Sequence, residues 1–205
     1  MPEDAWKYYW SRREIAEKFG FGENLSNSKV EGEEIPISEI IPKSIFLLDA
    51  GSGSGRYVYH LNKKVSVYVC ADLSREMLNV AKKRFGQLEN VYFIRCDIEF
   101  LPFLNDTFDV TLCVSVLRHL PFKKGERVFK ALTRVTKNLF FFTAYLTLNS
   151  EEPALNFVGD LGILDHAFKL ETLKNWAHPF KIQREVRLLN EYYINRRYLF
   201  VVKKR

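Results

Sequence analysis

Short apolar runs alternate with amphipathic stretches from Ile45 to the end of the 205-residue chain. Such alternation is typical of βαβ units, in which parallel strands are covered by helices. Strands that are buried on both faces form continuous apolar runs rich in Val, Ile and Phe. Five runs fit this description: Ile45–Asp49, Val65–Ala71, Val91–Cys96, Phe108–Val114 and Leu139–Leu146. Two further runs, Ile182–Leu189 and Tyr193–Val202, are expected to be the last two strands.

The connections between these runs predict how the strands pair. Three stretches carry apolar residues at helical spacing: Ser74–Phe85 with Ser74 as N-cap, Lys123–Val135 and Leu170–Ala177. Only a few residues separate the last two runs, which suits a hairpin and is too short for a parallel crossover. We therefore expect an α/β fold, with a mostly parallel sheet flanked by helices and an antiparallel pair at its end.

The first 44 residues follow a different pattern. Ala5–Phe19 is aromatic, charged and compatible with a helix, and the stretch that follows is rich in Gly, Asn, Ser and Pro, which predicts loops. We therefore expect a helical and loop cap at 1–44 and one main domain at 45–205. The aromatic residues between 6 and 10 could close over a ligand or pack on the core as an amphipathic helix.

Composition excludes several classes of protein. No apolar run approaches the length of a membrane span, and the acidic N-terminus lacks the apolar region of a secretory signal. Cys70, Cys96 and Cys113 lie far apart, with no CxxC motif and no nearby Cys/His cluster. This spacing argues against a zinc site or a disulfide framework. We expect a cytoplasmic protein without a metal site.

The net charge of +6 is unevenly distributed. Residues 174–205 hold nine Lys and Arg against two Glu, which is +7, so the rest of the chain sums to −1. A basic C-terminal end can attract the phosphates of a nucleic acid. It can equally be a solvated outer face of the last strands, and the charge alone does not separate the two.

The glycine-rich turn after the first apolar run carries the strongest functional signal. Asp49 is followed by three alternating glycines, Gly51, Gly53 and Gly55, and then by a helix candidate. Glycines let the backbone turn tightly and approach a ligand closely. Arg56 stands where a G-x-G-x-x-G dinucleotide motif needs its last glycine, and no P-loop motif is present.

Polar residues follow the next three apolar runs as well. Asp72 is placed to accept from the hydroxyls of a ribose, or to help cap the following helix. Asp97 could accept from the amino group of a base while Ile98 packs on the base, or it could simply begin a loop. The fourth site is the stretch from Ser115 to Leu120. In an open α/β sheet, ligands bind at the carboxyl ends of the strands, so four coincident placements indicate one binding site.

These motifs resemble those of the class I S-adenosylmethionine (SAM)-dependent methyltransferases, especially the small group often called type 11. The resemblance runs from about Ile45 to Tyr145 and covers the glycine turn, the D-L-S-x-x-M-L start of the helix at Asp72, and the pair Asp97-Ile98. It continues through Leu101-Pro102-Phe103, Asp106-x-Phe108-Asp109-Val110 and Ser115-Val116-Leu117-x-His119-Leu120.

The resemblance implies a Rossmann-like, seven-stranded sheet with its last strand antiparallel. It also implies SAM as cofactor and S-adenosylhomocysteine as product. The residues that match the family's cofactor-binding positions are Asp49, Gly51, Ser52, Gly53, Gly55, Asp72, Leu73, Asp97, Ile98 and Ser115.

A sulfonium methyl group is already electrophilic, so the protein mainly has to align the reactants and exclude water. If the acceptor must lose a proton, His119 is the best-placed candidate for a general base, although it could equally be a structural histidine. His166, beside Asp165 in the insertion at 149–168, is a weaker candidate. Arg118 departs from the common His-His pair of the family.

The motifs do not name the methyl acceptor, and three functions stay open. The chain could methylate a small molecule or an RNA base, and residues 101–134 also resemble methyltransferases of tRNA wobble uridines. It could instead be a non-catalytic SAM-binding partner subunit. A nicotinamide oxidoreductase is disfavoured by Arg56 and Asp97. The oligomeric state is not predicted.

Overall fold

The computed structural model describes residues 9, 11–12, 34–43, 45–147, 154–158, 164–187 and 196–204. The predicted helix at Ala5–Phe19 lies almost entirely outside these ranges, and the division at residue 44 stays a prediction. The helices are α3 (Glu34–Ile40), α4 (Arg56–Leu61), η2 (Asn62–Lys64), α5 (Arg75–Phe85), η3 (Ile98–Phe100), η4 (Leu117–His119), α6 (Phe122–Val135) and α7 (Leu170–Ala177). The strands are β1 (Phe46–Ala50), β2 (Val67–Asp72), β3 (Val91–Arg95), β4 (Phe108–Cys113), β5 (Thr136–Leu146), β6 (Ala154–Val158), β7 (Leu164–Phe168), β8 (Lys181–Arg187) and β9 (Arg196–Lys203).

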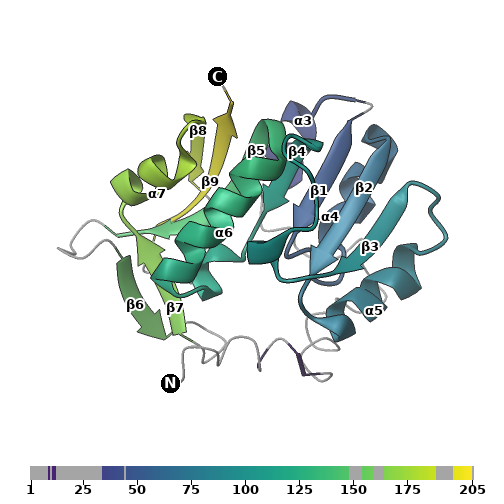
Figure 1. Cartoon of the computed structure of the whole chain (residues 1–205), viewed down its shortest axis with the longest axis horizontal. Coiled ribbons are helices and arrows are strands. Elements are labelled where there is room, and N and C mark those ends of the chain that lie inside the picture. Colours follow the sequence, from purple (N-terminus) through teal and green to yellow (C-terminus); the bar gives the residue numbers. More distant parts are fainter. Residues whose placement is uncertain are drawn as a thin grey trace.

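The described strands form one nine-stranded sheet (Figure 1). Strands β3, β2, β1, β4 and β5 are neighbours in that order and run parallel. Strand β9 pairs antiparallel with β5, and β8 pairs antiparallel with β9. These seven strands correspond to the seven strands that the sequence predicts, which confirms the Rossmann-like α/β fold and the antiparallel strand at the end of the sheet.

The remaining two strands come from the segment that the sequence marked only as an insertion. Strands β6 and β7 pair antiparallel, and β7 pairs parallel with the end of β5 at Tyr145 and Leu146. Strand β4 pairs with the earlier part of β5, as far as Phe142, so β7 joins the sheet beyond the end of β4. The adjacent polar residues Asp165 and His166 interrupt the apolar pattern of β7, which hides this strand in the sequence.

The stretch at 20–44, which the sequence marks as rich in loop residues, also contains the helix α3. Proline is tolerated in the first turn of a helix, where its missing N–H would have had no partner, so Pro36 does not prevent α3 from forming. Ile37 in α3 and Ile41 just after it are buried in the hydrophobic core, and Ile41 N–H donates to the Ile37 carbonyl at 3.0 Å. Burial of these two side chains outweighs the weak local helix signal.

Two hydrophobic clusters cover the two faces of the sheet. The first holds the buried faces of α3, α4 and α5, and the second holds those of α6 and α7. In Figure 1, α6 crosses the near face, while α3 and α4 lie behind the sheet. This three-layer arrangement is what continuous apolar strands require, since both of their faces must be shielded from water.

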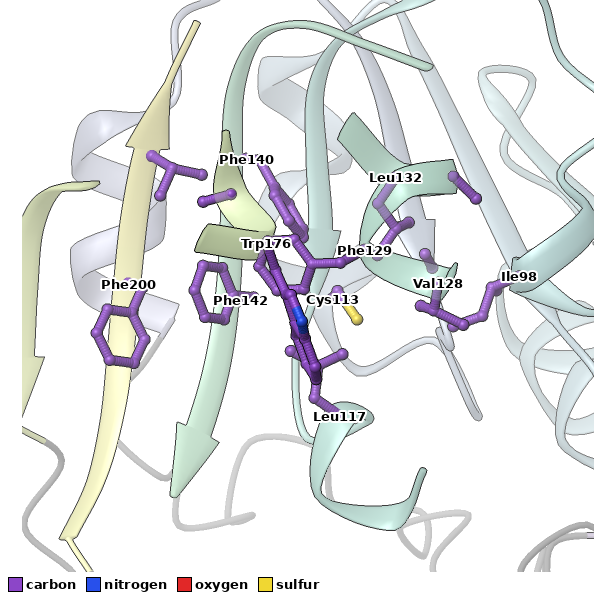
Figure 2. Packing of buried hydrophobic residues seen from close by; sticks show 14 of the residues in the cluster. Ile98, Cys113, Leu117, Val128, Phe129, Leu132, Phe140, Phe142, Trp176 and Phe200 are labelled. Atoms are coloured by element: carbon purple, nitrogen blue, oxygen red, sulfur yellow. The ribbon is translucent and has the colours of Figure 1, made fainter. Parts of the chain in front are cut away.

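Aromatic side chains fix α6 against β5. The Phe129 ring lies edge-on to Phe140 and Phe142, with centroids 5.1 and 4.8 Å apart, and Phe142 stacks on Phe200 at 4.8 Å. Figure 2 shows these rings in the cluster together with Ile98 and Leu117. Ile98 belongs to η3 and Leu117 to η4, so the same core anchors two short helices at the carboxyl edge of the sheet.

Within the described ranges, no helix combines the length and the apolar character that crossing a membrane requires. The same residues include no group of three or more His, Cys, Asp and Glu placed to hold a metal ion.

Candidate cofactor site at the carboxyl edge of the sheet

The predicted site residues gather where four adjacent parallel strands end. The register pairs Ala50 at the end of β1 with Ala71 in β2, and Asp72 at the end of β2 with Arg95 at the end of β3. Strand β4 flanks β1 on its other side. The glycine turn, Asp72, Asp97 and Ser115 therefore follow the ends of neighbouring strands, as the sequence predicts.

The glycine turn is built on left-handed backbone. Gly51, Gly53 and Gly55 have φ values of +77°, +54° and +82°, which only glycine adopts without strain. An added Cβ at Gly51 would lie 2.3 Å from Cγ2 of Val116, so the fold itself requires this glycine. An added Cβ at Gly53 would meet nothing within 4 Å. The backbone of Gly53 thus borders open space, which suits close approach of a ligand.

Asp72 ties this turn to the next helix. Its Oδ2 accepts from Gly53 N–H at 2.8 Å, and its Oδ1 accepts from Ser74 N–H at 2.8 Å. Ser74 in turn caps α5, with its Oγ accepting from Met77 N–H at 3.1 Å. Burial raises the pKa of Asp72, while the backbone donors at Ser74 and Gly53 oppose that rise. A carboxylate offers about four acceptor sites, so the structural role and the ribose role are compatible.

Asp49 lies beneath the turn and is buried, at 2% exposure. The Tyr68 hydroxyl donates to its Oδ2 at 2.8 Å. Burial raises the pKa of Asp49 to about 7, although the Tyr68 hydrogen bond and the charge of Arg56 lower it. The side chain of Asp49 therefore supports the turn from below, and a direct contact with the cofactor stays a prediction.

The other turn residues also serve the fold. The Ser52 side chain is buried, and Gly51 and Ser52 N–H both donate to the Ala71 carbonyl, at 2.7 and 3.1 Å. A Cβ at Gly55 would lie 3.1 Å from the ring of Phe85. The Leu73 carbonyl accepts from Arg95 Nε at 3.1 Å. These contacts hold the backbone that the cofactor would meet, and cofactor contacts of these residues stay predictions.

The pair Asp97-Ile98 splits into two roles. Asp97 caps η3, with its Oδ1 accepting from Glu99 N–H at 3.1 Å. Ile98 is buried in the core cluster shared with α6, so most of its side chain is used for packing. Lys124 in α6 donates to both carboxylate oxygens of Asp97, a contact that the sequence analysis missed. No sequence signal separates this lysine from a solvated one on the same helix.

Ser115 begins the loop after β4 with a left-handed backbone of φ +61°, rare for a residue other than glycine. Its N–H donates to Thr143 Oγ1 at 2.7 Å, a bond that reaches across to β5. Such strain often accompanies ligand sites. The cofactor contact predicted for Ser115 is compatible with this position.

The predicted base His119 belongs to a buried polar cluster. Its Nδ1 lies 2.8 Å from Asp165 Oδ1, and Arg118 Nε donates to its Nε2 at 3.0 Å. Arg118 also donates to the Tyr145 hydroxyl and lies 3.9 Å from Asp165 Oδ2. The sequence placed Asp165 beside His166, whereas the structure brings its carboxylate to His119. Arg118 lies within the predicted stretch from Ser115 to Leu120, but neither Arg118 nor Tyr145 was assigned a role from the sequence.

Burial lowers the pKa of His119 to about 4, although the Asp165 contact opposes this shift. The imidazole is therefore neutral at pH 7, with Nε2 as the acceptor and the proton on Nδ1, toward Asp165. His119 can take up a proton only after Arg118 releases Nε2. Burial also lowers the pKa of His166. The general-base role of His119 stays a prediction.

Comparison with known proteins agrees with this geometry. Residues 47–138 match the family described as "Methyltransferase domain". A ubiquinone/menaquinone biosynthesis C-methyltransferase from Rickettsia typhi is 34% identical over 100 residues, 42% of this chain and 40% of that protein. A ubiquinone biosynthesis O-methyltransferase from Coxiella burnetii is 30% identical over 152 residues, 68% of this chain and 64% of that protein. The chain thus spans 40 to 64% of these two relatives.

Among solved structures, the 1,6-didemethyltoxoflavin N1-methyltransferase of Burkholderia thailandensis matches with a TM-score of 0.69 at 18% identity. The match covers 97% of this chain and 89% of that one. The Burkholderia structure holds 1,6-didemethyltoxoflavin and S-adenosylhomocysteine. At this identity the likeness establishes the fold.

Proposed function

We propose that this chain, whose residues 47–138 match the family described as "Methyltransferase domain", is an enzyme that transfers the methyl group of SAM to a small-molecule acceptor. The observation that carries the cofactor assignment is the open space at Gly53, beside the Asp72 carboxylate. A side chain at position 53 would fill this space. Within the described part of the chain, Asp72 is the only acidic side chain that is hydrogen-bonded to the turn, and it is bonded at Gly53 itself.

When bound, SAM supplies an electrophilic methyl group, so the protein needs to provide binding, alignment and exclusion of water. The backbone at Gly51–Gly55 would hold the methionine part of the cofactor. Asp72 would accept from the ribose hydroxyls. Asp97 would accept from the amino group of adenine, while Ile98, Leu73 and Ser115 would complete the walls of the site.

The names of the relatives support a small-molecule acceptor. The Rickettsia and Coxiella proteins are named for steps of quinone biosynthesis, and the Burkholderia enzyme is solved with the small molecule that it methylates. An RNA acceptor, a tRNA wobble uridine in particular, and a non-catalytic partner subunit stay predictions from the sequence. The basic C-terminal end carries no further observation in favour of RNA, and the cytoplasmic location likewise stays a prediction.

The acceptor would approach where η4, β5 and β7 meet, next to Arg118 and His119. If the acceptor must lose a proton, His119 would take it at Nε2 after Arg118 moves away. An acceptor that is already a nucleophile needs no base. His119 would then have only a structural role, through its contacts with Arg118 and Asp165.

Calorimetry with SAM and with NAD tests the cofactor assignment. We expect SAM to bind and NAD not to bind. Asp72→Asn removes the charge that strengthens its hydrogen bonds, worth about 1.5–3 kcal/mol, and should weaken SAM binding by more than tenfold. Asp109→Asn is the matched control, because Asp109 accepts from Phe46 N–H near the opposite edge of the sheet. Equal SAM affinity for all three proteins would overturn the ribose assignment.

A second assay tests catalysis and the acceptor class. The protein is incubated with methyl-labelled SAM and, separately, with the small-metabolite, RNA and protein fractions of a cell extract. Label in the metabolite fraction supports the proposal. Label in RNA would instead favour the nucleic-acid alternative, and SAM binding without any transfer would favour the non-catalytic one.

A further inference from the structure

Lys124 places a positive charge inside the protein, next to the proposed adenine site. It lies in the first turn of α6, and its side chain is only 9% exposed. Its ammonium group donates to Asp97 Oδ1 at 3.1 Å, to Asp97 Oδ2 at 2.9 Å and to Glu99 Oε2 at 2.7 Å. A buried ammonium is costly unless it is paired, and these two carboxyl groups are its partners.

A second cation on α6 balances the charge. Arg127, one turn after Lys124, donates to Glu99 Oε1, and this bond together with Lys124 lowers the pKa of Glu99. The formal charges of the two carboxylates and the two cations thus sum to zero. The two cations differ in position, because Arg127 is 54% exposed and contacts Glu99, whereas Lys124 is buried and reaches Asp97 as well.

These contacts leave Asp97 with a defined acceptor. An ionised carboxylate offers about four acceptor sites. Two bonds reach Oδ1, from Glu99 N–H and Lys124, and one reaches Oδ2, from Lys124. Within the described part of the chain, one lone pair of Oδ2 therefore remains for a ligand. The carboxylate cannot rotate without breaking a bond to Lys124.

We propose that Lys124 is a positioning residue that holds Asp97 as a fixed acceptor, so that the site selects a 6-aminopurine over a 6-oxopurine. This inference rests on the proposed function, since it takes the adenine ring of the cofactor to lie at Asp97. An amino group donates to the remaining lone pair. A carbonyl oxygen at the same place would set two acceptors against each other, which costs binding free energy.

The test compares S-adenosylhomocysteine with its deaminated analogue, S-inosylhomocysteine, by calorimetry. The unmodified protein should bind the adenosine compound at least tenfold more tightly. Lys124→Met should weaken adenosine binding by about tenfold and change inosine binding by less than about threefold, which collapses the selectivity. Arg127→Met is the matched control, because it removes the neighbouring cation without touching Asp97, and its selectivity should equal that of the unmodified protein.

Two outcomes would overturn the inference: undiminished selectivity in Lys124→Met, or an equal loss of selectivity in Arg127→Met. If Lys124→Met does not fold, the double variant Lys124→Met/Glu99→Gln keeps the local charge at zero and must show the same loss. Lys124→Arg, which keeps the charge, must retain most of the selectivity. Failure of the unmodified protein to bind S-adenosylhomocysteine would instead overturn the proposed function.

Discussion

At the scale of single residues, Asp49 lies beneath the glycine turn and supports it. Its ionised form destabilises the folded protein, because the carboxyl group is buried. Its carboxyl is buried under the glycines and receives the Tyr68 hydroxyl, and burial raises its pKa to about 7 from 3.8. Between about pH 4 and pH 7 the folded protein therefore keeps a proton that the unfolded chain has released. Asp49 stabilises the fold fully below pH 4, and this contribution is lost as the pH rises through 7.

Asp49→Asn should remove this pH dependence, because a carboxamide does not titrate. The free energy of unfolding of the unmodified protein, relative to that of the variant, should fall between pH 4 and pH 7 by up to about 4 kcal/mol. Urea unfolding of both proteins across this range measures the difference. His119, whose lowered pKa acts in the opposite direction between about pH 4 and 6.5, is present in both proteins and cancels. Parallel profiles would show that Asp49 does not titrate in this window.

At the scale of elements, one ion pair links the short helix η4 to strand β7. Asp165 of β7 is only 2% exposed and lies against His119 and Arg118 of η4. The register gives β7 two pairing positions with β5, so backbone hydrogen bonds to the main sheet contribute little to its attachment. The side-chain cluster therefore carries much of the connection between β7 and the proposed acceptor side of the site.

Asp165→Ala should destabilise the fold, because it removes the buried carboxylate that lies 2.8 Å from His119 Nδ1 and 3.9 Å from the Arg118 guanidinium. Breaking a buried pair from one side costs about 3 kcal/mol or more. Urea unfolding measures this loss, and hydrogen exchange should show the amides of Leu164–Phe168 losing protection before those of β1. Glu126→Gln is the control, since it breaks an exposed pair with Lys130 and should change stability by less than about 0.5 kcal/mol. A loss no larger than that of the control would contradict a structural role for this cluster.

At the scale of the whole molecule, the sequence predicts the recurring strands and the residues at their ends, and it misses features that depend on contacts between distant residues. The strands from β1 to β5 are continuous apolar runs, and the site residues follow their ends, so both could be recognised locally. Strand β7 is paired at one end of β5 and carries two polar residues, so its alternation is too short to detect. Lys124 meets Asp97 across 27 positions, and a lysine in the first turn of a helix gives no local sign of burial.

The proposed cofactor would contact residues that follow four neighbouring strands, and the hydrophobic clusters on both faces share those strands. Ligand binding should therefore stabilise the described sheet as one unit. S-adenosylhomocysteine at 100 times its dissociation constant adds about 2.7 kcal/mol, which for a chain of this length raises the Tm by about 5–11 °C. Calorimetry should show a single transition that shifts as a whole. Two transitions, of which only one moves with the ligand, would mean that the sheet does not unfold cooperatively.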